Sequence, residues 1–235
     1  MKLLAIESSG LTAGCAVIED GRLLGEYDTN FKKTHSETLL PMTEALLNML
    51  EIKPSDIDAI GLSKGPGSFT GLRIGIATVK GLAMALDIPV VPVPTTAGIA
   101  YNLFGTSGLI CPIMDARRSQ VYTGLYRFEG EKLVKVRDQM AVSVDELCTS
   151  LNGLGEPVTF LGDGIDVYRG RIEDLMTNGF SFAPCHLRYQ RAAAMGMLAY
   201  EYYKEGLSIK GDDLVPEYLR LSQAERELKE KNDGK

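Results

Sequence analysis

The sequence predicts an α/β protein made of two similar lobes. Residues 2–29 and 109–140 each show an apolar strand ending in a carboxylate, a turn, a second strand, a glycine turn and a third strand. Ile6-Glu7-Ser8 and Met114-Asp115-Ala116 occupy matching places in the two regions. Helical patterns follow each region, so the order of elements is repeated once along the chain.

The division into lobes follows from this repeat and from the linker Gly105–Gly108. We expect a first lobe over 1–105 and a second over 106–211, with 212–235 packing back on the first. At 45% hydrophobic and 24% charged residues, the chain has ample material for a core.

Composition also bounds the function. No apolar run reaches the roughly 18 residues that a membrane span needs, and Glu7 interrupts the first run too early for a signal peptide. The four cysteines are far apart and form no C-x-x-C pair, which indicates a reducing, cytoplasmic compartment. With a net charge of −6, the chain is a poor nucleic-acid binder alone, so any RNA is expected to be held by a partner.

The elements of the first lobe begin with three antiparallel strands, the second and third joined by a hairpin turn at Asp20-Gly21. Thr34 and Glu37 form a T-x-x-E capping box that starts a helix. The predicted strands are 2–7, 13–19, 22–29, 57–63 and 88–93, and the predicted helices are 35–51, 70–86 and 95–104, with a short helical turn at 54–57.

In the second lobe we expect strands over 109–116, 120–128, 132–140 and 158–161, and helices over 143–151, 167–174 and 191–205. Asp145 and Glu146 favour the start of the first of these helices, because carboxylates stabilise a helix N-terminus. A charged helix over 222–231 is expected if it finds a packing surface.

A glycine-rich stretch, Gly65 to Gly75, joins the strand at 57–63 to the helix at 70–86. A glycine turn that opens a helix can bind an anion through free backbone N–H groups. It can equally be a tight strand-to-helix turn, because it matches neither common phosphate-loop pattern. Both interpretations remain open at this level.

The helix at 70–86 has two apolar faces. Leu72, Ile76, Val79, Leu82, Ala83 and Leu86 share one face, which indicates core. Ile74, Thr78, Gly81 and Ala85, with Ala77 beside them, form the opposite face. Only Arg73 and Lys80 mark a polar strip. The second face either is buried within its own domain or contacts a partner, and the helix at 35–51 also carries surplus apolar residues.

Several segments together carry a family resemblance: Leu3 to Glu26, Lys33 to Pro41, Gly65 to Gly75, Pro112 to Tyr122 and Pro216 to Arg220. They resemble the bacterial TsaB (YeaZ) family, and the string from Gly65 to Gly75 is specific to it. The resemblance covers nearly the whole chain. It implies the two-lobed sugar-kinase/Hsp70/actin-like (ASKHA) fold, with a mixed sheet flanked by helices in each lobe.

The resemblance also implies a function. Such proteins are similar to TsaD, which transfers a threonylcarbamoyl group to N6 of the adenosine 3′ to the anticodon, in tRNAs reading codons that begin with A. The chain would be a non-catalytic scaffold or activator acting with TsaD and TsaE, contacting tRNA only through that complex. A homodimer is left open. The expected partner-binding residues are Leu39, Met42, Leu46, Phe69, Arg73, Ile74, Ala77, Thr78, Lys80 and Gly81.

No metal site and no required cofactor are expected. TsaD-type proteins carry an H-x-E-G-H metal motif, and here Thr95 and Ile99 stand where its histidines would be. The nucleotide site implied by the fold would use Glu7, Ser8, Ser9, Gly10, Asp115 and Arg117. The turn after Asp115 lacks glycines, so phosphoryl transfer is not expected. ATP or ADP at the joint with TsaD stays open.

Two alternative functions remain. A glycoprotease-like hydrolase would use His35 with Ser36 and Glu37, although adjacent residues at a helix start do not face each other and the capping box already explains the segment. An ATP-dependent kinase on the same fold is the other, and tight Mg-ATP binding by the isolated chain would favour it.

Overall fold

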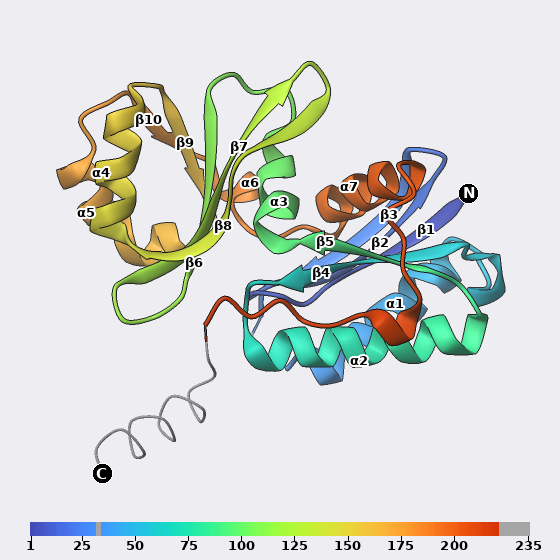
Figure 1. Cartoon of the computed structure of the whole chain (residues 1–235). Coiled ribbons are helices and arrows are strands. Elements are labelled where there is room, and N and C mark those ends of the chain that lie inside the picture. The colour runs from blue at the N-terminus through green and yellow to red at the C-terminus, as the bar shows by residue number, and fades with distance from the viewer. Residues whose placement is uncertain (32–33, 221–235) are drawn as a thin grey trace, which may run out of the picture.

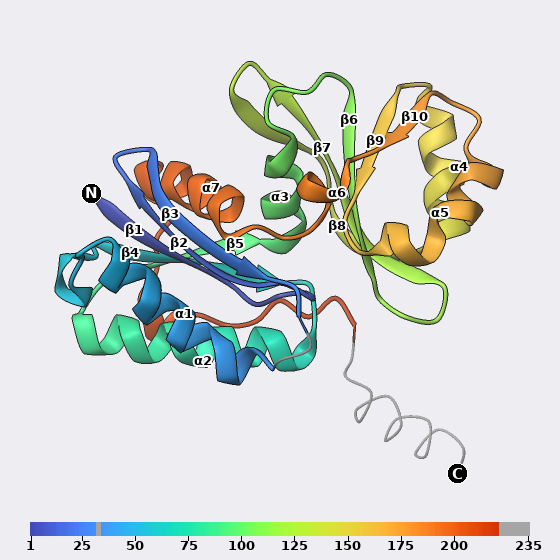
Figure 2. The ribbon, with the colours of Figure 1, turned by 180° about the vertical axis from the view of Figure 1, so that it is seen from behind.

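The computed structural model describes residues 1–31 and 34–220. It consists of two five-stranded sheets with helices on both faces of each (Figures 1 and 2). The helix expected over 222–231 lies outside the described residues, as do Lys32 and Lys33.

The first sheet has the strand order β3-β2-β1-β4-β5. Strand β1 is antiparallel to β2 and parallel to β4, because the connection from β3 to β4 passes through a helix that returns the chain. Its elements are β1 (Lys2–Glu7), β2 (Ala13–Glu19), β3 (Arg22–Thr29), α1 (His35–Met49), a 3₁₀ turn (Pro54–Asp56), β4 (Ala59–Gly65), α2 (Phe69–Leu86) and β5 (Val90–Pro94).

The second sheet has the order β10-β9-β6-β7-β8, which repeats the topology of the first. The repeat expected from the sequence is therefore confirmed, and Glu7 and Asp115 end the equivalent strands β1 and β6. Its elements are β6 (Leu109–Asp115), β7 (Gln120–Glu129), β8 (Lys132–Ser143), α4 (Val144–Leu154), β9 (Val158–Leu161), α5 (Gly164–Leu175), β10 (Phe180–Phe182) and α6 (Cys185–Arg188).

Two further helices lie between the sheets: α3 (Thr95–Ala100), followed by a 3₁₀ turn (Tyr101–Leu103), and α7 (Ala192–Lys204). The described residues form three apolar clusters. One lies between α1, α2 and the first sheet, one around α3 and α7, and one between the second sheet and α4 and α5 (Figure 1). Along β1, Leu4 and Ile6 face the first cluster and Leu3 and Ala5 face the second, since successive residues point to opposite faces. Burial on both faces explains why β1 is apolar throughout.

Helix α7 returns the chain to the first lobe earlier than expected. The expected second lobe extended to residue 211, yet α7 packs on β1, β2 and β4. The backbone N–H of Ala192 donates to Asp28 Oδ1 over 3.2 Å, and that of Ala193 donates to Glu26 Oε1 over 2.7 Å. Glu26 and Asp28 of β3 thus accept hydrogen bonds from free N–H groups at the helix start, so the first lobe holds α7.

Helix α2 is long and apolar enough to cross a membrane by length and composition, contrary to the expectation that no stretch qualifies. Its apolar content has another physical cause. Leu72, Ile76, Val79 and Ala83 are buried, as the sequence pattern predicts for that face, and the last three belong to the cluster against the first sheet. A helix that covers a sheet with one apolar face and carries a second apolar face outside is as long and as apolar as a membrane-spanning helix.

Candidate functional site

The glycine-rich stretch lets α2 approach the turn after β1. Ser8 Oγ donates to the carbonyl of Gly71 over 3.0 Å, and the N–H of Ser68 donates to the carbonyl of Ser9 over 2.8 Å. A Cβ atom on Gly71 would lie 2.2 Å from the backbone oxygen of Ser8. On the side that faces the turn after β1, the space beside the start of α2 is thus filled by the protein's own backbone, which supports the interpretation as a tight turn.

Two more glycines of the stretch follow the same rule. A Cβ on Gly67 would lie 2.1 Å from the carbonyl oxygen of Ser9, and one on Gly75 would lie 2.1 Å from Ser8 Oγ. Ser68 caps the helix by accepting a hydrogen bond from the N–H of Gly71. Glycines are therefore spaced four residues apart, at 67, 71 and 75, because each of them lies against the Ser8–Ser9 turn.

Glu7 lies at the centre of a buried hydrogen-bond cluster. Its Oε1 accepts from the Ser9 N–H over 2.7 Å and from Ser9 Oγ over 2.5 Å, and its Oε2 accepts from Ser63 Oγ. Only 2% of Glu7 is exposed. Burial raises the pKa of Glu7, while the hydrogen bonds from Ser63 and Ser9 oppose that rise. The cluster joins the ends of β1 and β4.

The residues expected to bind nucleotide therefore fall into two separate groups. Glu7, Ser8 and Ser9 are buried and bonded within the first lobe, while Gly10 lies against the side chain of buried Gln190. In the second lobe, Asp115 Oδ1 accepts from Tyr168 OH over 3.1 Å and from the N–H of Arg117 over 2.9 Å. The Arg117 side chain is 87% exposed and pairs with Asp115. Nucleotide binding by these residues stays a prediction.

Asp163 is a second carboxylate of this region, in the turn between β9 and α5. It lies two residues after β9, beside the end of β6, whose last residue is Asp115. Its Oδ1 is buried without a hydrogen-bond partner among the described residues. Burial and the nearby charge of Asp115 raise the pKa of Asp163 to about 6. The sequence signal for this buried carboxylate is the G-D-G pattern, in which the acid is flanked by two glycines that pack closely against β6.

Asp163→Asn is expected to make the protein more stable at neutral pH. Because its folded-state pKa exceeds the unfolded value, the folded state binds the extra proton between pH 4 and 6, and stability falls as pH rises through that window. The neutral amide avoids this loss of up to about 3 kcal/mol. Thermal unfolding from pH 4 to 8 measures it, with the exposed Asp174→Asn as control. Parallel pH profiles for Asp163→Asn and the parent would contradict the assignment.

The positions that correspond to the metal-binding histidines are part of the core. Thr95 and Ile99 lie on α3, and each is only 1% exposed. All six residues of α3 are buried between the two sheets. Over residues 1–31 and 34–220, no group of three or more histidine, cysteine or acidic side chains could hold a metal ion.

The His35 and Ser36 side chains do not form a nucleophile–base pair. His35 Nε2 donates to the carbonyl of Gly10 over 2.9 Å, and Ser36 Oγ lies 3.0 Å from Thr34 Oγ1. The Thr34 N–H donates to the carboxylate of Glu37 over 3.1 Å, as the capping box predicts. The segment acts as a helix start, and the hydrolase alternative finds no catalytic geometry there.

The outer face of α2 is open along most of its length. Ala77, Gly81, Met84 and Ala85 are exposed, and Ile74 and Thr78 are half-buried. Met84 is 78% exposed, and no described atom lies within 4 Å of where a Cβ on Gly81 would be. This face carries small residues together with Ile74 and Met84, and the small residues permit close approach of another helix.

Helix α1 lies beside α2 on the same face of the first sheet (Figure 2). The expectation that Leu39 and Leu46 contact a partner is contradicted, because they are only 1% and 2% exposed and pack in the first-lobe core. Met42 is half-buried. The large apolar residues that α1 exposes are Leu40 and Met49, which the sequence counts among the surplus apolar residues of this helix without assigning them a side.

The remaining expected residues, Phe69, Arg73 and Lys80, contact the segment that ends the described chain. We call residues 214–220 the strap. Tyr218 of the strap stacks on Phe69 with ring centroids 4.2 Å apart, and its hydroxyl accepts from Arg73 Nε over 3.1 Å. Lys80 Nζ donates to the carbonyl of Asp212, just before the strap. These residues form an edge of the outer face rather than its centre.

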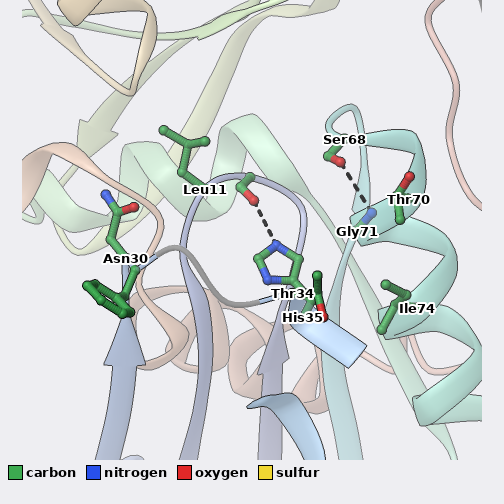
Figure 3. A pocket seen from close by; sticks show the side chains of 10 residues that line it. Leu11, Asn30, Thr34, His35, Ser68, Thr70, Gly71 and Ile74 are labelled. Carbon is green, nitrogen blue, oxygen red and sulfur yellow. Dashed lines mark hydrogen bonds between the residues drawn. The ribbon is translucent and has the colours of Figure 1, made fainter. Parts of the chain in front are cut away.

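A pocket of about 610 Å³ lies between the starts of α1 and α2 (Figure 3). Leu11, Phe31, His35 and Ile74 are among the residues that line it, and Phe31 is 72% exposed. The pocket adjoins the outer face of α2, because Thr70 and Ile74 of that helix line it. An apolar recess beside exposed apolar helix faces is a feature of protein-binding surfaces.

Comparison with known proteins gives consistent matches. The family model TsaD, tRNA N6-adenosine threonylcarbamoyltransferase, matches residues 24–228. The tRNA threonylcarbamoyladenosine biosynthesis protein TsaB of Bacillus subtilis is 39% identical over 226 residues, which cover 96% of each chain.

Solved structures agree with these sequence matches. YeaZ from Pseudomonas aeruginosa has a TM-score of 0.81 at 26% identity, covering 93% of this chain and 99% of that one. An inorganic polyphosphate/ATP-glucomannokinase from Arthrobacter has a TM-score of 0.52 at 12% identity, covering 87% and 99%, and shows the fold alone. The expected sugar-kinase/Hsp70/actin-like fold class is confirmed.

Proposed function

This chain belongs to the TsaB family and takes part in tRNA threonylcarbamoyladenosine biosynthesis, and we propose that it is a non-catalytic subunit that binds TsaD. The proposed contact is the outer faces of α1 and α2, packed against helices of the partner. TsaE would join the same complex, and tRNA would be held through the complex. The proposed place of action is the cytoplasm.

The observation that carries this proposal is the outer face of α2. A helix that already buries one face on its own sheet gains nothing within the monomer from a second face of small and apolar residues. Exposed Ala77, Gly81 and Met84 on α2, with exposed Leu40 on the neighbouring α1, supply a surface for a helix–helix interface. The same surface on a second copy would allow a homodimer that competes with TsaD.

The absence of a catalytic role is supported by the buried cluster around Glu7 and by the core positions of Thr95 and Ile99. These groups are bonded or packed within the chain, where a substrate has no contact with them. We propose that no cofactor is required, and that ATP or ADP, if bound, lies at the joint with TsaD.

Reconstitution tests the proposal. The purified chain is mixed with TsaD, TsaE, ATP, tRNA and a threonylcarbamoyl donor, and the modified adenosine is quantified by mass spectrometry after each component is omitted in turn. We expect omission of this chain to reduce the product to background. We also expect no product when TsaD alone is left out. Product formed without TsaD would show that this chain is itself the catalyst.

A further inference from the structure

The strap contacts both lobes as it leaves the first. At its centre, the N–H of Glu217 donates to the carbonyl of Lys64 over 2.8 Å, and its carboxylate pairs with Lys64 Nζ over 2.8 Å. Gln139 of β8 donates through Nε2 to Glu217 Oε1 over 2.6 Å and to the carbonyl of Gly65 over 3.1 Å. One side chain of the second lobe therefore binds the strap and the end of β4 together.

Gly65 makes this contact possible. Its φ of +123° lies in a region that side chains disfavour, and a Cβ there would lie 2.3 Å from the carbonyl oxygen of Glu217. The strap thus lies directly on the backbone at the end of β4. The glycine-rich stretch holds the strap at Gly65 and the Ser8–Ser9 turn at its later glycines.

The end of the strap holds a turn of the second lobe. Arg220 donates through Nη1 to the carbonyl of Ala116 over 2.5 Å and to that of Arg117 over 3.3 Å. The residues of this turn, Arg117 to Ser119, have φ values of 64°, 55° and 57°. Three consecutive non-glycine residues in the left-handed region cost conformational free energy. The turn therefore depends on the hydrogen bonds that neighbouring side chains make to it.

We infer that the strap links the second-lobe turn at 116–119 to the outer surface of α2, and so regulates partner binding at that surface. Tyr218 contacts Phe69 and Arg73 on α2, and only Leu219 separates it from Arg220. Leu214 at the start of the strap is buried in the first-lobe core and anchors that end of the segment. A displacement of the other end, at Arg220, is therefore passed to the residues between them. A change at the turn therefore alters how Phe69 and Arg73 are presented.

The linkage itself is independent of the proposed function. Only its effect on partner binding rests on that function, which assigns the α2 surface to a partner. Thermodynamic coupling is reciprocal, so a partner that binds the α2 surface has to protect the turn at 116–119 to the same degree. Arg220 is the most informative residue because its guanidinium donates to two carbonyls of the turn.

Amide hydrogen exchange of the isolated full chain tests the linkage without a partner. Arg220→Ala is expected to speed exchange at the start of α2 as well as at the turn, and Tyr218→Ala to speed exchange at the turn as well as at α2. Arg171→Ala, which removes an exposed second-lobe ion pair, is the control. Tyr218→Phe keeps the ring stack but loses the Arg73 bond, and serves if the alanine variant does not fold. Changes confined to the neighbourhood of each substitution would overturn the inference.

Binding to TsaD provides the second measurement. By titration calorimetry, Arg220→Ala is expected to weaken binding about 5- to 10-fold, within the range typical of allosteric coupling. Ala77→Arg, in the centre of the surface, serves as the test of the surface itself. If Ala77→Arg abolishes binding while Arg220→Ala binds like the parent, the linkage is wrong and the proposed function stands. If neither variant weakens binding, the proposed surface is wrong, and hydrogen exchange decides the linkage alone.

Discussion

Ala77→Arg is expected to abolish association with TsaD while the monomer stays folded. Ala77 is exposed at the middle of the outer face of α2, where arginine is a good helix former and meets solvent in the free protein. In a helix–helix interface with axes about 8–10 Å apart, the same side chain has to clash or bury an unpaired charge. We expect a loss of at least about 100-fold in affinity, since a buried unpaired charge costs about 3–5 kcal/mol.

Co-elution and calorimetry with TsaD measure the loss, and circular dichroism with thermal unfolding confirms the fold. Val167→Arg is the matched control, because Val167 is 59% exposed on α5 of the second lobe. Undiminished co-elution of Ala77→Arg would place the partner surface elsewhere. A variant that unfolds would mean that Ala77 supports the monomer.

Gly71→Ala is expected to destabilise the protein by about 3 kcal/mol or more, although alanine favours a helix by about 1 kcal/mol over glycine. The added Cβ would lie 2.2 Å from the backbone oxygen of Ser8, and 3.2 Å from a ring carbon of His35. Neither α2 nor the turn after β1 can move without breaking the bonds between them, because Ser8 Oγ also donates to Gly71.

Gly81→Ala is the matched control for this substitution, in the same helix and with the same change of one methyl group. No described atom lies within 4 Å of its added Cβ, so it is expected to stabilise the monomer by about 1 kcal/mol. Denaturant unfolding of both variants gives the comparison. Equal stability of the Gly71→Ala variant and the parent would contradict the packing role of the glycine stretch.

The sequence predicted most elements because their signals are local. The period-two and period-3.6 patterns of apolar residues locate β9 at 158–161 and the two faces of α2, and glycine turns mark the hairpins. Among the described residues, strand β10 and helix α6 were not predicted. Strand β10 has three residues and α6 has four, too few to show a period, and β10 is held by its pairing with β9.

The candidate site was predicted only in part. The outer face of α2 follows from the sequence, since Ala77 and Gly81 lie opposite Leu72 and Val79 at 100° per residue. On α1 the apolar residues span half the circumference, so the sequence alone does not fix which of them face the sheet. The structure buries Leu39 and Leu46 and exposes Leu40 and Met49.

The sequence by itself determined the two-lobed repeat, the family, and the presence of an apolar outer face on α2. Only the tertiary structure decided what the glycine-rich stretch does. Its glycines are needed because the Ser8–Ser9 turn and the strap lie against the backbone there, and those segments are about 60 and 150 residues away in the chain. Contacts over such separations leave no local pattern, so an anion site and a packing line have the same sequence signature.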